Sequence, residues 1–158
     1  MRDLNLWLDP LGLETYFTRL GNFGEEQVIG ALNNSGNYTH VFQVQNAANQ
    51  GIDIVAKTPD GHYDIFEVKT TRGGSMPSLY GDQLNPNDFI QSRLRTAGEN
   101  SGAFRLSSEK AADINANIGK KYLVEVEVGT GAKGRWYVEN MQQKDWDTEA
   151  NRIKGGGH

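Results

Sequence analysis

Hydrophobic and polar residues alternate along three short segments in the middle of the chain. The pattern predicts strands over His40–Gln45, Gly51–Thr58 and His62–Thr71. The sequence Pro59-Asp60-Gly61 separates the last two segments and is typical of a tight turn. We therefore expect the second and third strands to form an antiparallel hairpin.

Apolar residues at helical spacing flank these strands. A helical pattern begins at Phe17, and a second helix is expected from about Gly24 to Asn33. Farther along, the pattern predicts a helix that starts at Asn85–Asp88, a helix over Ser107–Ile118, and a strand over Tyr122–Val128 that pairs with Gly134–Glu139. The expected fold class is α/β (α+β), a central mixed β-sheet flanked by helices. We expect one domain over residues 14–150 and a flexible tail over 151–158, and the pattern leaves open whether 120–150 extend the sheet, form a substrate groove or bind an inhibitor.

Composition narrows the chemistry that this domain can perform. The 158 residues include no cysteine and only three histidines, which excludes disulfides, thiolate nucleophiles and cysteine-ligated zinc. Metal ligands would therefore be mainly carboxylates, which suit Mg²⁺, Mn²⁺ or Ca²⁺. No apolar run is long enough for a membrane span. Residues 1–67 hold 3 Lys and Arg against 9 Asp and Glu, whereas residues 68–158 hold 13 against 11, so a phosphate-binding surface is expected in the second part.

The hairpin turn determines which residues of its two strands face each other. A turn centred near Asp60 pairs positions whose numbers sum to about 120, so Asp53 faces Glu67 and Ile54 faces Phe66. Because side chains alternate along a strand, Asp53, Glu67 and Lys69 are expected on one face. The same alternation predicts an apolar patch on the other face, formed by Ile52, Ile54, Phe66 and Val68.

Two carboxylates directly opposite each other on a sheet repel, and a divalent cation between them removes that repulsion. Asp53 and Glu67 would hold Mg²⁺ with a backbone carbonyl and waters, and Glu25 of the preceding helix would project toward them as a third acidic group. Lys69 would polarise the attacking water or hold the transition-state phosphate. The alternative is that Asp53 and Glu67 only form a surface ion pair with Lys57 or Lys69. Glu25 would then only stabilise its helix, by a favourable interaction with the helix dipole.

Glu25, Gly51-Ile52-Asp53 and Glu67-Val68-Lys69, in this order, resemble the PD-(D/E)XK nuclease superfamily. The resemblance implies a restriction-endonuclease-like core in which these acidic residues and the lysine assemble around Mg²⁺ to hydrolyse phosphodiesters. Ile52 stands where the nominal motif has proline. Residues 81–90 also resemble a segment of bacterial toxin nucleases in this superfamily, where a glutamine opens a helix beside the metal. That match assigns to Gln83 the positioning of water or substrate, and the alternative is an ordinary polar loop residue.

The sequence Asp9-Pro10-Leu11-Gly12-Leu13 resembles the DPxGL junction at the end of the core of rearrangement-hotspot (Rhs) proteins. These proteins release a variable toxin by self-cleavage behind the last leucine. The resemblance implies that residues 1–13 belong to the end of the Rhs shell and that a toxin domain starts at Glu14. Asp9 and Leu13 would mark the cleavage junction. The rest of the self-cleaving site would lie upstream, so we do not expect this chain to cut itself.

Together these resemblances predict a metal-dependent nuclease toxin, a type VI secretion effector used in interbacterial competition. It would be injected by the producer, act in the cytoplasm of the target bacterium and be neutralised by a cognate immunity protein. DNA is the favoured substrate and tRNA the alternative, with Arg72, Arg93 and Arg95 as expected phosphate contacts. The sequence is also compatible with a metal-independent ribonuclease that uses His40 and His62, and with a non-catalytic interaction module.

Overall fold

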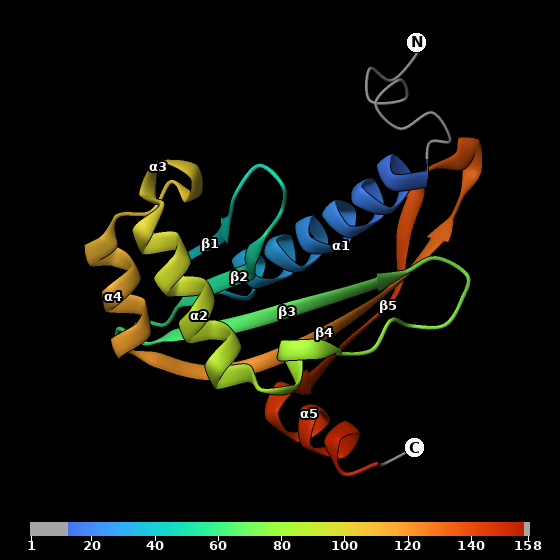
Figure 1. The fold of residues 1–158 in the computed structure, drawn as a ribbon. Coiled ribbons are helices and arrows are strands. Elements are labelled where there is room, and N and C mark those ends of the chain that lie inside the picture. The colour runs from blue at the N-terminus through green and yellow to red at the C-terminus, as the bar shows by residue number, and fades with distance from the viewer. Residues whose placement is uncertain (1–12, 157–158) are drawn as a thin grey trace.

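A five-stranded mixed sheet forms the centre of the fold in the computed structural model, which describes residues 13–156 (Figure 1). The strands lie side by side in chain order; β3 pairs with β4 in parallel and the other neighbours are antiparallel. The strands are β1 (His40–Gln45), β2 (Gly51–Lys57), β3 (Tyr63–Thr71), β4 (Ile118–Thr130) and β5 (Trp136–Asp145). The expected α+β fold with a central mixed sheet flanked by helices is confirmed.

Helices cover both faces of this sheet. The α-helices are α1 (Leu13–Ser35), α2 (Pro86–Glu99), α3 (Ser101–Phe104), α4 (Ser108–Ala116) and α5 (Trp146–Lys154), and the short 3₁₀ helices are η2 (Gly81–Leu84) and η3 (Ala132–Gly134). A parallel strand pair needs a long crossover, and α2, α3 and α4 form this crossover between β3 and β4. After β3 the chain therefore runs back along the sheet through α2, α3 and α4 before β4 begins.

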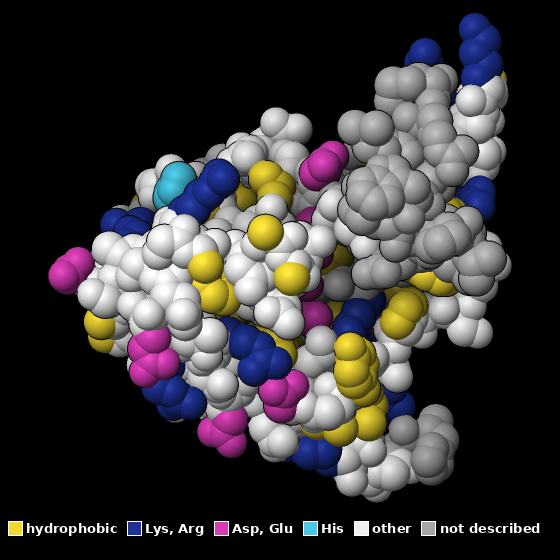
Figure 2. Space-filling model, turned by 45° about the horizontal axis from the view of Figure 1, so that its top comes forward, with side chains coloured by type: hydrophobic (Ala, Val, Ile, Leu, Met, Phe, Trp, Pro, Cys, Tyr) yellow, Lys and Arg dark blue, Asp and Glu magenta, His cyan; other side chains and the backbone are white. Residues whose placement is uncertain are grey.

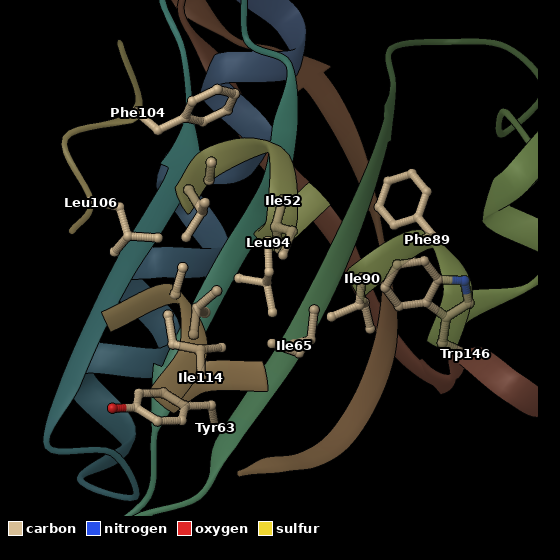
Figure 3. Packing of buried hydrophobic residues seen from close by; sticks show 14 of the residues in the cluster. Ile52, Tyr63, Ile65, Phe89, Ile90, Leu94, Phe104, Leu106, Ile114 and Trp146 are labelled. Carbon is tan, nitrogen blue, oxygen red and sulfur yellow. The ribbon is translucent and has the colours of Figure 1, made fainter. Parts of the chain in front are cut away.

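Two separate hydrophobic cores result from this arrangement. Leu20 and Val28 of α1 pack on one face of the sheet, against residues such as Phe66. On the other face α2 and α4 pack against β2 and β3, and Figure 3 shows Leu94 and Ile114 close to Ile65. Each helix presents one apolar side to the sheet, which is the usual way in which an amphipathic helix is stabilised in a small domain.

The N-terminal helix is continuous, so the expectation of a separate helix from Gly24 to Asn33 is wrong. Gly21 and Gly24 lie within α1, where a glycine costs about 1 kcal/mol relative to alanine but does not by itself end a helix. At Gly24 the helix approaches β3 so closely that an added Cβ would overlap the side chain of Thr70. Glycine is therefore required by packing at this position rather than by a break in the chain.

The C-terminal part of the chain contains more regular structure than its pattern predicts. The strands β4 and β5 are both longer than expected and extend the sheet, which answers what residues 120–150 do in the fold. Helix α5 follows β5 directly and includes residues 151–154, which we expected in a flexible tail. The indole of Trp146 is fully buried and holds this helix against Phe89 of α2.

The predicted Rhs junction lies outside the described residues, except for Leu13 at the start of α1. Its cleavage role, including that of Asp9, stays a prediction. Within residues 13–156, no helix has the length and apolar character needed to cross a membrane.

Candidate active site

The predicted hairpin register is observed from Ile54 to Lys57, but the predicted pair of Asp53 with Glu67 is not formed, because β2 and β3 separate at Asp53. The observed pairs Ile54↔Phe66 and Lys57↔Tyr63 both sum to 120, which confirms the register. The ladder ends at Ile54, and the Asp53 carboxylate accepts a hydrogen bond from the backbone N–H of Val68 at 2.9 Å. The Asp53 side chain thus continues the contact between the two strands where their backbones no longer pair.

One expectation about this hairpin is wrong, namely that Ile52 shares an apolar face with Ile54. Phe42 pairs with Val55 and Val44 pairs with Ile52. Two steps along β1 thus lie opposite three steps along β2, so β2 contains one additional residue here. Such a bulge changes the face on which the following side chains lie. Ile52 therefore packs in the core under α2, whereas Ile54 packs in the core under α1. The bulge surrounds Asp53 and directs its carboxylate into the gap between the strands.

Helix α1 brings Glu25 to Asp53 from one face of the sheet. Two amides of β1 lie with it: Gln43 Nε2 donates to Glu25 Oε1 at 2.6 Å, and Gln45 Nε2 donates to Asp53 Oδ1 at 3.0 Å. Gln45 Nε2 is also 3.4 Å from Glu25 Oε1. The close contact of Gly24 with β3 precedes Glu25 by one residue, so this packing determines how near the carboxyl group comes to the sheet.

The opposite face contributes Glu67, Lys69 and Gln83. The Gln83 side chain links the other two, because its Nε2 donates to Glu67 Oε2 at 3.0 Å and its Oε1 accepts from Lys69 Nζ at 2.9 Å. Lys69 Nζ is 3.7 Å from Glu67 Oε2 and lies over the ring of Tyr80 at 4.8 Å. The buried indole of Trp146 donates to the Gln83 carbonyl oxygen at 2.9 Å and fixes the η2 segment. All five predicted catalytic residues are thus brought together.

Burial of three neighbouring carboxyl groups raises their pKa values. Burial and then the Asp53 carboxylate raise the pKa of Glu25 to about 8. Burial likewise raises the pKa of Glu67 well above its usual range, with Asp53 adding to the effect and Lys69 opposing it. Burial raises the pKa of Asp53 despite the Val68 N–H and Lys69. One lysine does not compensate three buried carboxylates, so the site favours a bound proton or an added cation.

The donor chemistry of this cluster fits a hard divalent cation. Asp53 and Glu67 lie within hydrogen-bonding reach of each other and supply carboxylate oxygens, the ligands that Mg²⁺ prefers, and Mg²⁺ commonly uses only one or two of them. In residues 13–156, no three His, Asp or Glu side chains are grouped so that they could hold a metal ion together. Figure 2 shows acidic side chains deep in a cleft in the middle of this face, next to a Lys or Arg side chain.

The three predicted phosphate contacts have different surroundings. Arg72 donates to Tyr16 Oη at 2.9 Å and to Thr130 Oγ1 at 2.6 Å, so it links α1 to β4. Arg93 pairs with Asp82 at 2.9 Å beside η2, whereas Arg95 lines a hollow between α2 and α4. Arg93 is therefore close to the Gln83 segment, and a role in phosphate binding stays a prediction for all three.

The described part of the chain does not bring the two histidines of the ribonuclease alternative into one hollow. His40 lines a hollow beside β1, together with Lys110. His62 lies at the β2–β3 turn, where its Nδ1 is 3.2 Å from Asp60 and it lines another hollow.

Sequence reasoning missed the supporting residues around the carboxylates. The pattern places Gln43 and Gln45 only in a strand, although two amides at alternate positions of an otherwise apolar segment are a usable signal. Tyr80 and Gly24 carry no such signal, because their roles depend on contacts with Lys69 and Thr70 that are distant in sequence.

Comparisons with protein-family models, curated proteins and solved structures find no match for this chain.

Proposed function

We propose that the chain is a metal-dependent nuclease of the PD-(D/E)XK type, with a restriction-endonuclease-like core. The observation that carries the proposal is the joining of five residues from four distant segments into one partly buried cluster: Glu25, Asp53, Glu67, Lys69 and Gln83. A surface ion pair does not explain it, because Glu67 and Lys69 are only 6% and 9% exposed. Buried charges without a function are rare, since removing them from water is costly.

Each side chain has a role that its contacts support. A bound divalent cation would supply a Lewis acid for a phosphodiester oxygen and lower the pKa of a water molecule. Asp53 and Glu67 would hold that cation, and Gln83 keeps Glu67 and Lys69 in fixed positions. The Lys69 ammonium would orient the attacking water or neutralise charge on the phosphate. Glu25, whose pKa is raised to about 8, would accept or release a proton during the reaction.

The biological setting follows from the Rhs-like junction at residues 9–13. In this proposal the domain is the toxin of an Rhs effector that acts on nucleic acid in the cytoplasm of a rival bacterium and is inhibited by an immunity protein. DNA is the favoured substrate, and cleavage of tRNA by the same site is the alternative. An interaction module remains the interpretation if no nucleic acid is cut.

The proposal is tested by incubating the purified protein with plasmid DNA and with tRNA, in Mg²⁺ or in EDTA. Asp53→Asn keeps an oxygen that can accept the Val68 N–H but removes the charge, so we expect a folded protein with activity lowered by about 100-fold or more. Asp60→Asn makes the same change in the exposed hairpin turn and should leave activity unchanged. Cleavage of tRNA alone would change the substrate but keep the mechanism. Failure of both substrates, or cleavage in EDTA, would refute the proposal.

A further inference from the structure

A hollow of about 540 Å³ lies along the edge strand β1, on the side of the sheet that α3 and α4 cover. It lies between β1, the β1–β2 loop and the segment that joins α3 to α4. Its lining includes His40, Phe42, Gln43, Gln45, Arg105 and Lys110. Gln43 and Gln45, whose amides bond to Glu25 and Asp53, also line this hollow, so strand β1 separates the hollow from the candidate active site.

The charge of this hollow is positive, although the chain as a whole has a net charge of −4. The described residues that line it include two cations, Arg105 and Lys110, and no Asp or Glu. The guanidinium of Arg105 is exposed and makes no hydrogen bond or ion pair within residues 13–156. Lys110 Nζ donates to the hydroxyl of Tyr63 at 2.9 Å. An anionic group placed here would meet cations without displacing an existing ion pair.

Arg105 occupies a backbone conformation that suits glycine better than arginine. Its φ of 54° and ψ of 41° are left-handed, and it ends helix α3. Glycine is the common residue at such helix ends, because it lacks the Cβ that makes this conformation unfavourable. A cation kept at this position despite its backbone cost points to a role for the side chain.

Aromatic and amide groups complete the hollow. The rings of His40 and Phe42 are stacked, with centroids 4.8 Å apart and an interplanar angle of 26°, and His40 is exposed. A stacked aromatic pair offers a flat surface on which a nucleobase can lie. Gln43 and Gln45 also line the hollow, with amides that already donate to Glu25 and Asp53.

We propose that this hollow binds one unpaired nucleotide of the strand that enters the carboxylate site, with its phosphate on Arg105 and Lys110 and its base on the ring of His40. The inference rests on the proposed nuclease function and adds how the substrate is held. A hollow of this size accommodates a nucleotide but not a base pair within a duplex. The protein therefore selects a nucleic acid with unpaired nucleotides beside the cut, and phosphate and base are common to DNA and RNA.

The test compares two substitutions that make the same chemical change. Arg105→Gly removes a cation from a left-handed position in the hollow, and Lys133→Gly does the same at the β4–β5 turn, where φ is 59° and Lys133 is exposed. Both should retain or raise Tm, because glycine fits both backbones. Binding is measured by fluorescence anisotropy in the Asp53→Asn background, with a labelled single-stranded DNA, an RNA of the same sequence and a blunt duplex as probes.

We expect Arg105→Gly to weaken single-strand binding about fivefold at about 0.1 M salt and to reduce the salt slope by about 0.7. Lys133→Gly should change neither. His40→Ala should weaken binding of the single strand about tenfold and leave the blunt duplex unaffected. In the active protein, Arg105→Gly should raise KM with little change in kcat. Preference between the DNA and RNA probes identifies which strand the hollow takes.

The proposal is overturned if Arg105→Gly and Lys133→Gly behave alike, or if the blunt duplex binds as tightly as the single strand and is equally sensitive to His40→Ala. Its failure is distinguishable from failure of the nuclease function. If cleavage occurs but does not depend on Arg105, only the proposed binding role of the hollow is refuted. If the protein cleaves neither DNA nor RNA but binds a single strand through Arg105 and His40, only the proposed nuclease function is refuted.

Discussion

Replacing Gly24 by alanine tests whether the close contact of α1 with β3 builds the candidate active site. In an ordinary helix this change stabilises a protein by about 0.5–1 kcal/mol. Here the new Cβ would overlap Oγ1 of Thr70, with Cβ and Cγ2 of Thr70 both at 3.0 Å, so rotation of the Thr70 side chain gives no relief. Overpacking of this kind costs about 1–3 kcal/mol. We expect a net loss of about 1–2 kcal/mol.

Urea unfolding of three variants measures this effect. Gly30→Ala is the control, because Gly30 is in the same helix and a Cβ there would meet nothing within 4 Å; it should stabilise the protein by about 0.5–1 kcal/mol. In Gly24→Ala/Thr70→Ala the buried hydroxyl, which has no partner among the described residues, and Cγ2 are removed, so part of the loss should be recovered. Equal stability of Gly24→Ala and Gly30→Ala would refute the reasoning.

The raised pKa of Glu25 predicts a pH dependence of stability in the metal-free protein. Glu25 in the folded state holds a proton that the unfolded state releases above pH 4.5, so the free energy of unfolding should fall between pH 5 and about 8. The fall should be less steep in Glu25→Gln. Equal slopes of the two proteins in urea unfolding at several pH values would contradict this. Added Mg²⁺ should raise Tm more at pH 8 than at pH 5, because a cation binds deprotonated carboxylates, and calorimetry of Asp53→Asn should show little of this effect. An undiminished effect in that variant would exclude Asp53 as a ligand.

Local patterns predicted the parts of the fold in which neighbouring residues determine the outcome. The turn at Pro59–Gly61 and the alternation around it were sufficient for the hairpin register. A helix was predicted from Ser107, and the structure has α4 beginning at Ser108, with the Ser107 side chain accepting from the Lys110 N–H as its cap. The bulge in β2 was not predictable in this way, because it depends on how β1 pairs across the sheet. Helix α5 was missed because the burial of Trp146 depends on α2.

The sequence by itself predicted which residues form the candidate site. Alternation along β3 was sufficient to place Glu67 and Lys69 on the same face, since it is a local property of the backbone, whereas the bulge in β2 determines where the Asp53 side chain lies. Only the tertiary structure decided that Glu25 and Gln83 reach them, because contacts across the sheet depend on how closely helices pack. It also decided that Glu67 and Lys69 are buried and that Glu25, Asp53 and Gln83 are half-buried, and this burial raises the pKa values of the three carboxyl groups.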